Sequence, residues 1–231
     1  MTDGHSRFLI DVRIVAPRIE PSQAVFVRAF RRYGLPRAIR CDNGAPFGST
    51  GAGGLTRLSA WWLKLGIEPH FIHPASPQEN GRHERMHRTL KAQTSRPAAA
   101  DARAQQRRFD AFRRHYNEQR PHEALGQRPP HEVYTPSQRA MPDEVAEPWY
   151  DADHQVRRVR PPGTVKWKGD QIFISEALVG ELIGIAELDT GSHLVRFCSR
   201  DIGLLDRQGR FRRFAPPRAG LCRPTTPDAA P

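Results

Sequence analysis

The order of hydrophobic and polar residues predicts alternating strands and helices in the first third of the chain. Apolar and polar side chains alternate in residues 6–15 and 37–41, which is the pattern of half-buried strands, and residues 67–73 form another short run of this kind. Apolar side chains recur every three to four residues in 21–33 and 55–66, which predicts two amphipathic helices. This alternation is typical of an α/β domain.

Two further helices are predicted in the middle of the chain, after a Gly-rich stretch at 47–54 (FGSTGAGG) that we expect to be a flexible loop. Ser76-Pro77-Gln78-Glu79 has the composition of a capping box, with Ser as the N-cap, Pro at the first helical position and Glu at the third. The box opens a helix that carries the stretch RHERMHRTLK and assigns a structural role to Glu79. Glu84, within that helix, is left without one. Residues 102–117 form the next predicted helix.

The pattern changes near residue 140, and this change divides the chain. Residues 1–140 form the predicted α/β core, and residues 141–158, rich in Pro and acidic side chains, are expected to be a linker. Short β-type runs separated by Gly-containing turns follow in 159–214, which predicts a small all-β domain of about five antiparallel strands, a barrel or a sandwich, of which we expect the barrel. Residues 215–231 are expected to be a disordered tail.

Charge points to a polyanionic partner. Lys and Arg number 36 against 25 Asp and Glu, and the formal net charge is +11. Between Arg82 and Arg120 there are ten Arg and one Lys against four acidic residues, so we expect this segment to meet DNA phosphates. The three cysteines have no Cys-x-x-Cys spacing, which suits a reducing cytoplasm, and no apolar run is long enough to span a membrane. We therefore expect a cytoplasmic, nucleoid-associated protein.

Two carboxylates are candidates for metal chemistry. Asp42 follows directly after the predicted strand 37–41, and catalytic groups of open α/β sheets gather at such strand ends. Glu84 lies one to two turns into the basic helix, on the same face as the residues Asn80, His87, Arg88 and Lys91. Two carboxylates can hold Mg²⁺. The alternatives are that Asp42-Asn43-Gly44 is an ordinary turn and that Glu84 forms only a surface ion pair with Arg88.

A zinc site is a second chemical interpretation of the same helix. His83-Glu84-Arg85-Met86-His87 matches H-E-x-x-H, which on a helix places two imidazoles on one face, as in zinc hydrolases. Three guanidinium groups crowd the motif, those of Arg82, Arg85 and Arg88, and they disfavour a bound dication. Zinc hydrolysis therefore remains a remote alternative.

Three stretches of the sequence resemble a known family. RCDNGAPF, HPASPQENGRHERMHRTLK and FDAFRRHYNEQRPHEALGQRPPHEVY are similar to segments of insertion-sequence transposases with a retroviral-integrase-type core, and the resemblance covers most of residues 3–139. It implies a ribonuclease H-like fold, an Asp-Asp-Glu site for Mg²⁺ or Mn²⁺, and cleavage and joining of DNA strands. By this match Asp42 is the second metal ligand and Glu84 the third. Arg88 and Lys91 fall where the family's helix contacts DNA, and His87 shares their face.

The match leaves the first catalytic Asp of the family without a counterpart. In the family this Asp precedes a D-x-H-S-R segment, which here is residues 3–7, at the start of the chain. Neither Asp3 nor Asp11 matches the catalytic position. We therefore expect an N-terminally truncated or split-frame transposase, which either acts with an upstream-encoded piece or binds DNA without cutting it. Transposition joins paired ends, so a homo-oligomer is expected.

Overall fold

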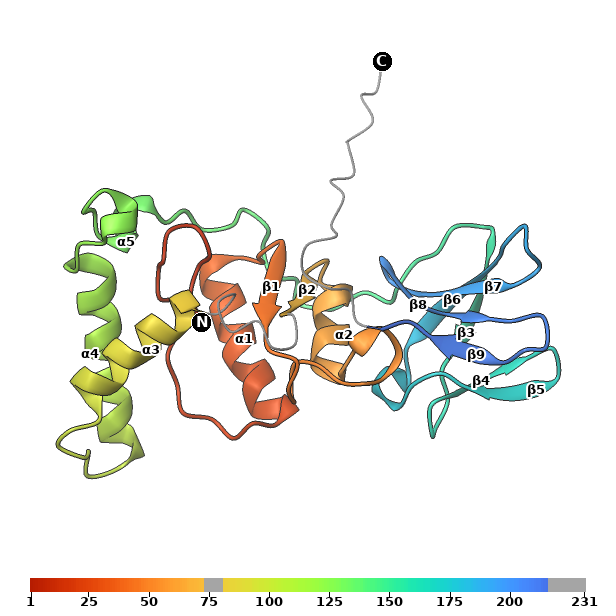
Figure 1. The fold of residues 1–231 in the computed structure, drawn as a ribbon, viewed down its shortest axis with the longest axis horizontal. Coiled ribbons are helices and arrows are strands. Elements are labelled where there is room, and N and C mark those ends of the chain that lie inside the picture. Colours follow the sequence, from red (N-terminus) through yellow and green to blue (C-terminus); the bar gives the residue numbers. More distant parts are fainter. Residues whose placement is uncertain (73–80, 216–231) are drawn as a thin grey trace, which may run out of the picture. The chain divides into compact units, whose positions relative to one another are not determined.

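The structure is a computed structural model that describes residues 1–72 and 81–215, apart from the side chains of Arg82 and His83. It divides into two compact units (Figure 1), one made of residues 1–36 and 76–143 and the other of 37–75 and 144–231. The grouping by contacts differs from the predicted division after residue 140, because residues 37–75 belong with the C-terminal part. The predicted capping box at 76–79 and most of the predicted tail lie outside the described residues.

Helices build the first unit. They are α1 (Ile19–Tyr33), α3 (Gly81–Thr94), α4 (Ala102–Glu118), the short α5 (Pro130–Val133) and a 3₁₀ turn, η3 (Glu123–Leu125). The predicted helices at 21–33 and 102–117 are confirmed. Local chemistry explains their ends: Gly34, with φ of 77°, ends α1, and the Asp101 carboxylate caps α4 by accepting the N–H of Ala104.

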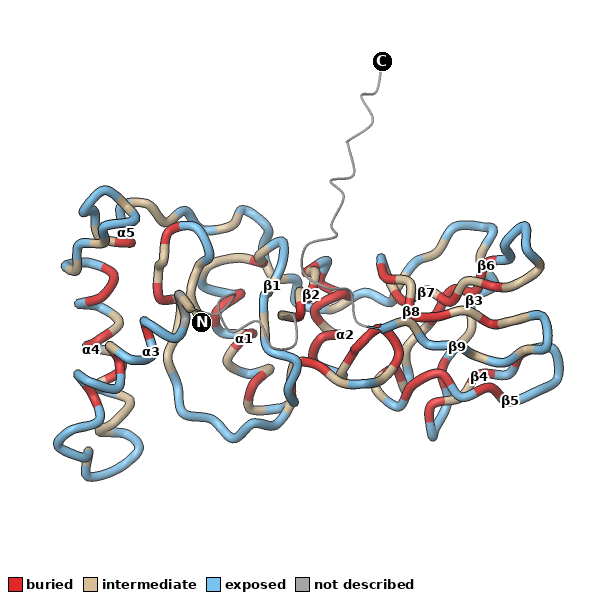
Figure 2. Tube along the Cα trace, viewed as in Figure 1, coloured by how far each residue is buried: buried red, intermediate tan, exposed pale blue. Residues whose placement is uncertain are grey.

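The core of the first unit lies between α3 and α4. Met86 and Leu90 of α3 are buried against Phe109, Phe112 and Tyr116 of α4. Leu9, from the N-terminal segment, is fully buried in the same cluster. These apolar residues occupy one side of each helix, so the opposite sides remain for solvent and for function (Figure 2).

The predicted strand at 6–15 is wrong: this segment forms only an isolated antiparallel bridge between Thr2 and Leu9. The backbone of Leu9 is paired by a side chain instead of by a neighbouring strand, since the Asn117 amide accepts the Leu9 N–H at 2.8 Å and donates to the Leu9 C=O at 3.1 Å. Two apolar residues further along, Ile14 and Val15, are exposed. Alternation alone does not make a strand where no partner strand is supplied.

The second unit begins with a small parallel pair. β1 (Ala38–Cys41) pairs with β2 (Glu68–Phe71), in agreement with the two predicted strands, and α2 (Arg57–Lys64) connects them. Thr56 and Ser59 form a capping box at the start of α2. The stretch 47–54 is not a free loop, because its last residues form a buried 3₁₀ turn, η1 (Ala52–Gly54).

The C-terminal part is an open antiparallel sheet. Its strand order is β3-β6-β7-β8-β9, made of β3 (His154–Arg158), β6 (Leu182–Glu187), β7 (His193–Phe197), β8 (Arg200–Leu205) and β9 (Phe211–Arg213). A separate hairpin pairs β4 (Thr164–Trp167) with β5 (Asp170–Phe173). The predicted closed barrel is therefore corrected. Within the described residues β9 pairs only with β8 and has three residues, and its Arg212 and Arg213 are exposed, features that discourage further pairing at an edge.

The sheet also starts earlier than expected. β3 lies in the predicted linker, where the Tyr150 hydroxyl donates to the C=O of Leu182 and anchors the chain ahead of the strand. The described chain is thus mixed α/β, as predicted, whereas the ribonuclease H-like arrangement stays a prediction. None of the helices in the described ranges is long and apolar enough to cross a membrane.

Asn117→Ala should destabilise the first unit, because it leaves both buried backbone groups of Leu9 without partners. The expected loss is about 2–4 kcal/mol in the free energy of unfolding, measured by urea titration followed by circular dichroism. Glu118→Ala is the matched control, since Glu118 is the exposed neighbour on the same helix. Equal stability of the two variants would show that the Asn117 amide is dispensable.

Candidate metal and nucleic-acid site

Asp42 stands at the carboxyl end of the parallel strand pair. The C=O of Cys41, just before it, accepts the N–H of Ile72 at 3.2 Å, and the side chain of Asn43, just after it, donates to the C=O of Ile72 at 2.8 Å. The backbone is therefore tied to the end of β2 on both sides of Asp42. The Asp42 side chain itself is exposed.

The segment after Asp42 is also a turn, as the alternative interpretation held. Oδ1 of Asp42 accepts the N–H of Gly44 at 3.1 Å, which is an Asx-type contact. The turn packs closely: a Cβ placed on Gly48 would lie 3.0 Å from the C=O oxygen of Asn43 and 3.1 Å from the ring of Phe71. The turn and the metal-ligand interpretations are compatible, because this contact occupies one carboxylate oxygen and leaves Oδ2 for another partner.

Glu84 lies on the exposed face of α3. Glu84, His87, Arg88 and Lys91 are all exposed, whereas Met86 and Leu90 are buried, so the predicted division of this helix into two faces is confirmed. Asn80, also predicted on the exposed face, lies outside the described residues. The alternative ion pair between Glu84 and Arg88 does not form, because neither residue takes part in any salt bridge within the described ranges.

His87 is held in an environment that favours the neutral imidazole. Desolvation of the ring lowers its pKa, and the positive charges of the N-terminal ammonium and Lys91 lower it further. A neutral imidazole can accept or donate a hydrogen bond and can bind soft metals. The side chain of His83, the other imidazole of the H-E-x-x-H motif, is outside the description, and no cluster of three His, Cys, Asp or Glu occurs among the described residues.

The two candidate carboxylates differ in their setting. Asp42 belongs to the second unit and Glu84 to the first. Both are exposed carboxylates that form no ion pair in the described part of the chain. Mg²⁺ prefers such oxygen ligands, whereas softer metals prefer sulfur and nitrogen ligands. Each carboxylate is thus of a type that fits Mg²⁺ or Mn²⁺.

Basic side chains are exposed on both α3 and α4 of the first unit. Exposed Arg85, Arg88 and Lys91 lie on α3, and α4, which packs against it, exposes Arg103, Arg107 and Arg114. Guanidinium groups that are exposed and not ion-paired are suited to phosphate contacts. The first unit therefore exposes positive charge beside Glu84 on α3 and, separately, on the side of α4 that faces away from α3, both in the segment where the sequence predicted it.

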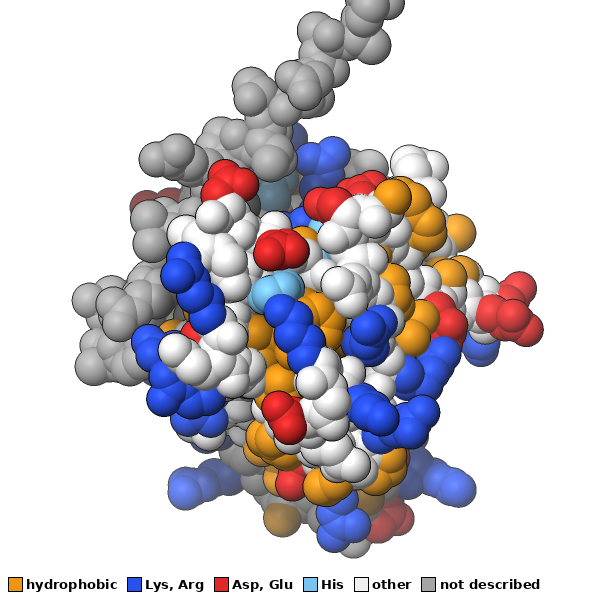
Figure 3. Space-filling model, turned by 90° about the vertical axis from the view of Figure 1, so that its right-hand side faces the viewer, with side chains coloured by type: hydrophobic (Ala, Val, Ile, Leu, Met, Phe, Trp, Pro, Cys, Tyr) orange, Lys and Arg blue, Asp and Glu red, His pale blue; other side chains and the backbone are white. Residues whose placement is uncertain are grey.

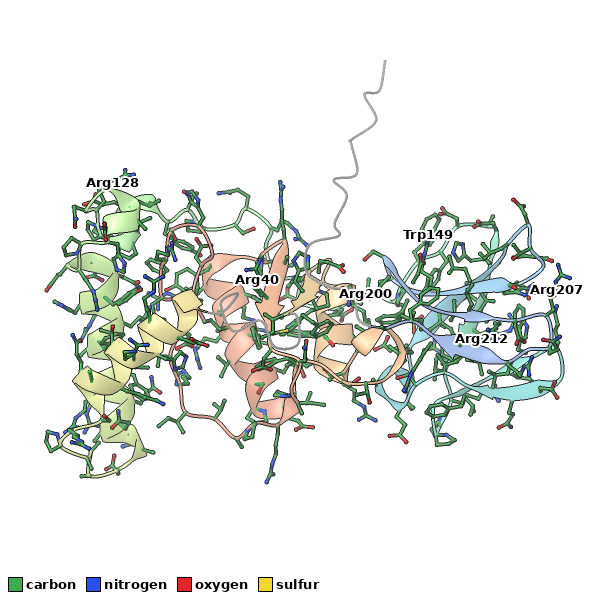
Figure 4. The ribbon with its side chains drawn as sticks, in the orientation of Figure 1. Arg40, Arg128, Trp149, Arg200, Arg207 and Arg212 are labelled. Atoms are coloured by element: carbon green, nitrogen blue, oxygen red, sulfur yellow. The ribbon has the colours of Figure 1, made fainter. Side chains whose placement is uncertain are left out.

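A second basic surface lies on the C-terminal sheet, and the sequence reading did not single it out. Arg207 and Arg212 line a shallow pocket of about 260 Å³ with Leu204 and Asp206 (Figure 4). Arg207 is preorganised, because its Nε and Nη2 both donate to the C=O of Thr190. Figure 3 shows Lys and Arg side chains among apolar ones on the face at this end. The available signal was the run RQGRFRRF at 207–214.

The two described cysteines are chemically quiet. Burial raises the pKa of Cys41 to about 12, with a smaller contribution from the neighbouring negative charge of Asp42. Burial likewise raises the pKa of Cys198 to about 12. Their thiols are therefore protonated at neutral pH, which argues against a nucleophilic or thiolate-ligand role next to Asp42.

The central part of the chain is similar to known proteins. The family described as "Integrase core domain" matches residues 65–130, which include Glu84 but not Asp42. The chain is also similar to the "Insertion element IS476 uncharacterized 39.2 kDa protein" of Xanthomonas euvesicatoria, with 36% identity over 98 residues, 42% of this chain. This match spans only 27% of that relative's length. The predicted resemblance to insertion-sequence transposases with an integrase-type core is confirmed.

Cys41 and Cys198 should resist alkylation in the folded protein. Because the reactive species is the thiolate, a pKa of about 12 leaves only a minute reactive fraction at pH 8. Labelling by iodoacetamide, mapped by mass spectrometry, should be at least tenfold slower at both residues than in the same protein unfolded in urea. Rapid labelling of Cys41 in the folded state would mean that the strand end beside Asp42 is open.

Proposed function

We propose that this chain carries part of the catalytic core of an insertion-sequence transposase, which cleaves and joins DNA strands with Mg²⁺ or Mn²⁺. The observation that carries the proposal is the integrase core domain match over residues 65–130, which contains the helix of Glu84. Asp42, the expected second metal ligand, supports the proposal because its carboxylate is exposed at the end of a parallel strand.

Asp42 and Glu84 are assigned to metal binding. When bound, divalent ions polarise the scissile phosphate and activate the attacking oxygen. The protein's own contribution is to hold the two carboxylates in place: Asp42 by the bonds of Cys41 and Asn43 to the end of β2, and Glu84 by the packing of α3 on α4. Neither group needs to donate or accept a proton for this role.

The exposed face of α3 is assigned to DNA. Arg88 and Lys91 follow Glu84 by about one and two helical turns, so a phosphodiester backbone beside the carboxylate could be held by both. His87 on the same side could donate or accept a hydrogen bond. The basic residues of α4 form a separate exposed set, and both sets would give the unit affinity without sequence specificity.

We assign the third metal ligand to a residue other than Asp3 and Asp11, the two acidic residues near the start of the chain. Asp3 is engaged locally, since it accepts bonds from the Ser6 N–H and hydroxyl, and Asp11 pairs with Arg13 and Arg28. The relative from the insertion element is much longer than the matched region. We propose that cleavage requires an upstream-encoded piece and assembly into a homo-oligomer on paired DNA ends.

Two other functions are less well supported. A transposase-derived protein that binds DNA without cutting it would need only the basic surfaces, and it becomes the better description if no upstream piece exists. A zinc hydrolase would need three protein ligands and an open position for water. Among the described residues no cluster of three candidate ligands supplies such a site.

Removing either carboxylate charge should abolish cleavage. In the chain supplied with the upstream segment encoded by its element, Glu84→Gln and Asp42→Asn should each reduce Mg²⁺-dependent cleavage of a labelled DNA end by at least about a thousandfold, because each removes a metal ligand. DNA affinity, measured in parallel by fluorescence anisotropy, should change by less than about threefold, since phosphates are held by Arg and Lys.

His83→Ala is the control that separates the two metals. Imidazole is a poor ligand for Mg²⁺, so this variant should retain cleavage within about tenfold of the parent. Complete loss of activity together with stoichiometric bound zinc would favour the hydrolase. The 231-residue chain alone should show little or no cleavage, and strong activity would assign the third ligand to Asp3 or Asp11.

DNA binding should depend steeply on salt. With six or more phosphates neutralised, affinity for a random duplex should fall roughly a thousandfold between about 50 and 200 mM salt. Replacing both Arg88 and Lys91 with Gln should reduce the slope of log affinity against log salt by about two. Arg18→Gln with Arg31→Gln removes the same charge from exposed sites on or beside α1 and should leave most of the slope intact. Equal effects of both pairs would exclude a specific role for α3.

A further inference from the structure

We propose that Arg200, on the C-terminal sheet, is a positioning residue for Asp42. The assignment rests on the proposed role of Asp42 and adds a function for the C-terminal sheet: it holds the strand that orients a catalytic carboxylate. Arg200 lies 158 positions after Asp42 in the sequence, and both belong to the second unit.

Arg200 is buried and reaches from β8 to β2. Only 5% of the residue is exposed, which is unusual for Arg. Its Nη2 forms an ion pair with the carboxylate of Glu68 and donates to the C=O of Pro69 at 2.8 Å. The guanidinium carbon lies 5.9 Å from the centre of the Phe71 ring (Figure 4). One side chain therefore contacts three of the four residues of β2.

β2 passes this constraint to Asp42 by short steps. Phe71 is the register partner of Cys41, and the next residue, Ile72, bonds to Cys41 on one side of Asp42 and to Asn43 on the other. The ring of Phe71 also lies under the turn at Gly48, where no side chain would fit without displacement. A shift of β2 along its axis would move the backbone on both sides of Asp42.

The contact is directional rather than a simple filling of space. Burying a guanidinium costs desolvation energy, and Nη1 of Arg200 has no partner in the described part of the chain, so the cost is only partly offset. An apolar side chain would pack without that cost but would not select the carboxylate of Glu68 and the C=O of Pro69 together. The ion pair therefore fixes the register of β2 against the sheet.

Other contacts hold the segment between β1 and β2, which contains η1 and α2, against the C-terminal sheet, and these contacts do not involve β2. Lys64 of α2 pairs with Glu181 at 2.9 Å, and the N–H of Gly53 donates to the C=O of Phe214 at 3.1 Å. Gly53 also lies so close to β8 that an added Cβ would be 3.0 Å from Ile202. Loss of Arg200 should thus loosen β2 and the Asp42 turn while α2 stays docked.

Hydrogen–deuterium exchange on the complete 231-residue chain tests the contact directly. In Arg200→Met, amides in peptides covering residues 38–48 and 68–72 should exchange at least tenfold faster, while peptides of α2 should change less. Arg200→Lys keeps the charge and should restore part of the protection. Glu68→Gln keeps the size of its side chain, removes the ion pair without emptying the core, and should reproduce the effect if Arg200→Met fails to fold.

Arg196→Met is the matched control. Arg196 lies on the adjacent strand β7 and pairs with Asp201 at 2.7 Å, but this pair is partly exposed and does not touch β2. Its removal should leave exchange at 38–48 unchanged. Equal protection of these peptides in Arg200→Met, Glu68→Gln and Arg196→Met would overturn the proposal.

The effect on function has its own measurement. In the chain joined to its upstream segment, Arg200→Met should raise the Mg²⁺ concentration for half-maximal cleavage about tenfold, with DNA affinity unchanged and partial rescue by Lys. A purely structural loss would lower the active fraction without moving the Mg²⁺ dependence, and that result counts against positioning. If Asp42→Asn leaves cleavage intact while the exchange result holds, the role of Asp42 fails but the contact between the sheet and β2 stands.

Discussion

Two parallel strands of four residues each cannot cover themselves, and this constraint shapes the second unit. Parallel pairs are stable when both faces are buried, and β1 and β2 present Phe71 and the partly buried Ile39 to their surroundings. β2 contacts α2 and the Arg200 side chain of the C-terminal sheet, and α2 in turn shares an apolar cluster with that sheet through Ala60 and Leu63. The integrase core match includes β2 but not the C-terminal sheet, so a strand inside the matched region is stabilised by a segment outside it.

In the first unit, α3 has one buried face and one exposed face. Met86 and Leu90 fix α3 on α4, so Glu84, Arg88 and Lys91 are presented without any role in the core. Within the described residues Glu84 forms no salt bridge, so its carboxylate is available for a metal, and the neighbouring Arg88 and Lys91 are available for a phosphate. The buried side determines where the helix lies, and the exposed side can carry chemistry at little cost to stability.

The sequence was sufficient to predict helices and strands that depend on residues close together in the chain. Helical periodicity predicted α1 and α4 closely, and the two faces of α3 followed from spacing alone. The segment 6–15 shows the limit: its alternation was correct for a strand, but the buried backbone of Leu9 is paired by Asn117, 108 positions away. Alternation describes a surface, whereas a strand also needs a partner.

Nonlocal contacts explain the remaining differences. The buried turn at Ala52–Gly54 looked like a flexible loop because its glycines reveal nothing of β8, against which Gly53 packs at a φ of 62°. Arg200, in the ordinary-looking string SRD, gave no sign of burial, since its partners Glu68 and Pro69 lie more than 130 positions earlier. Residues whose chemistry is visible in sequence, such as Asp42 and Glu84, can be nominated directly. Residues that would position them become visible only when the chain brings distant strands together.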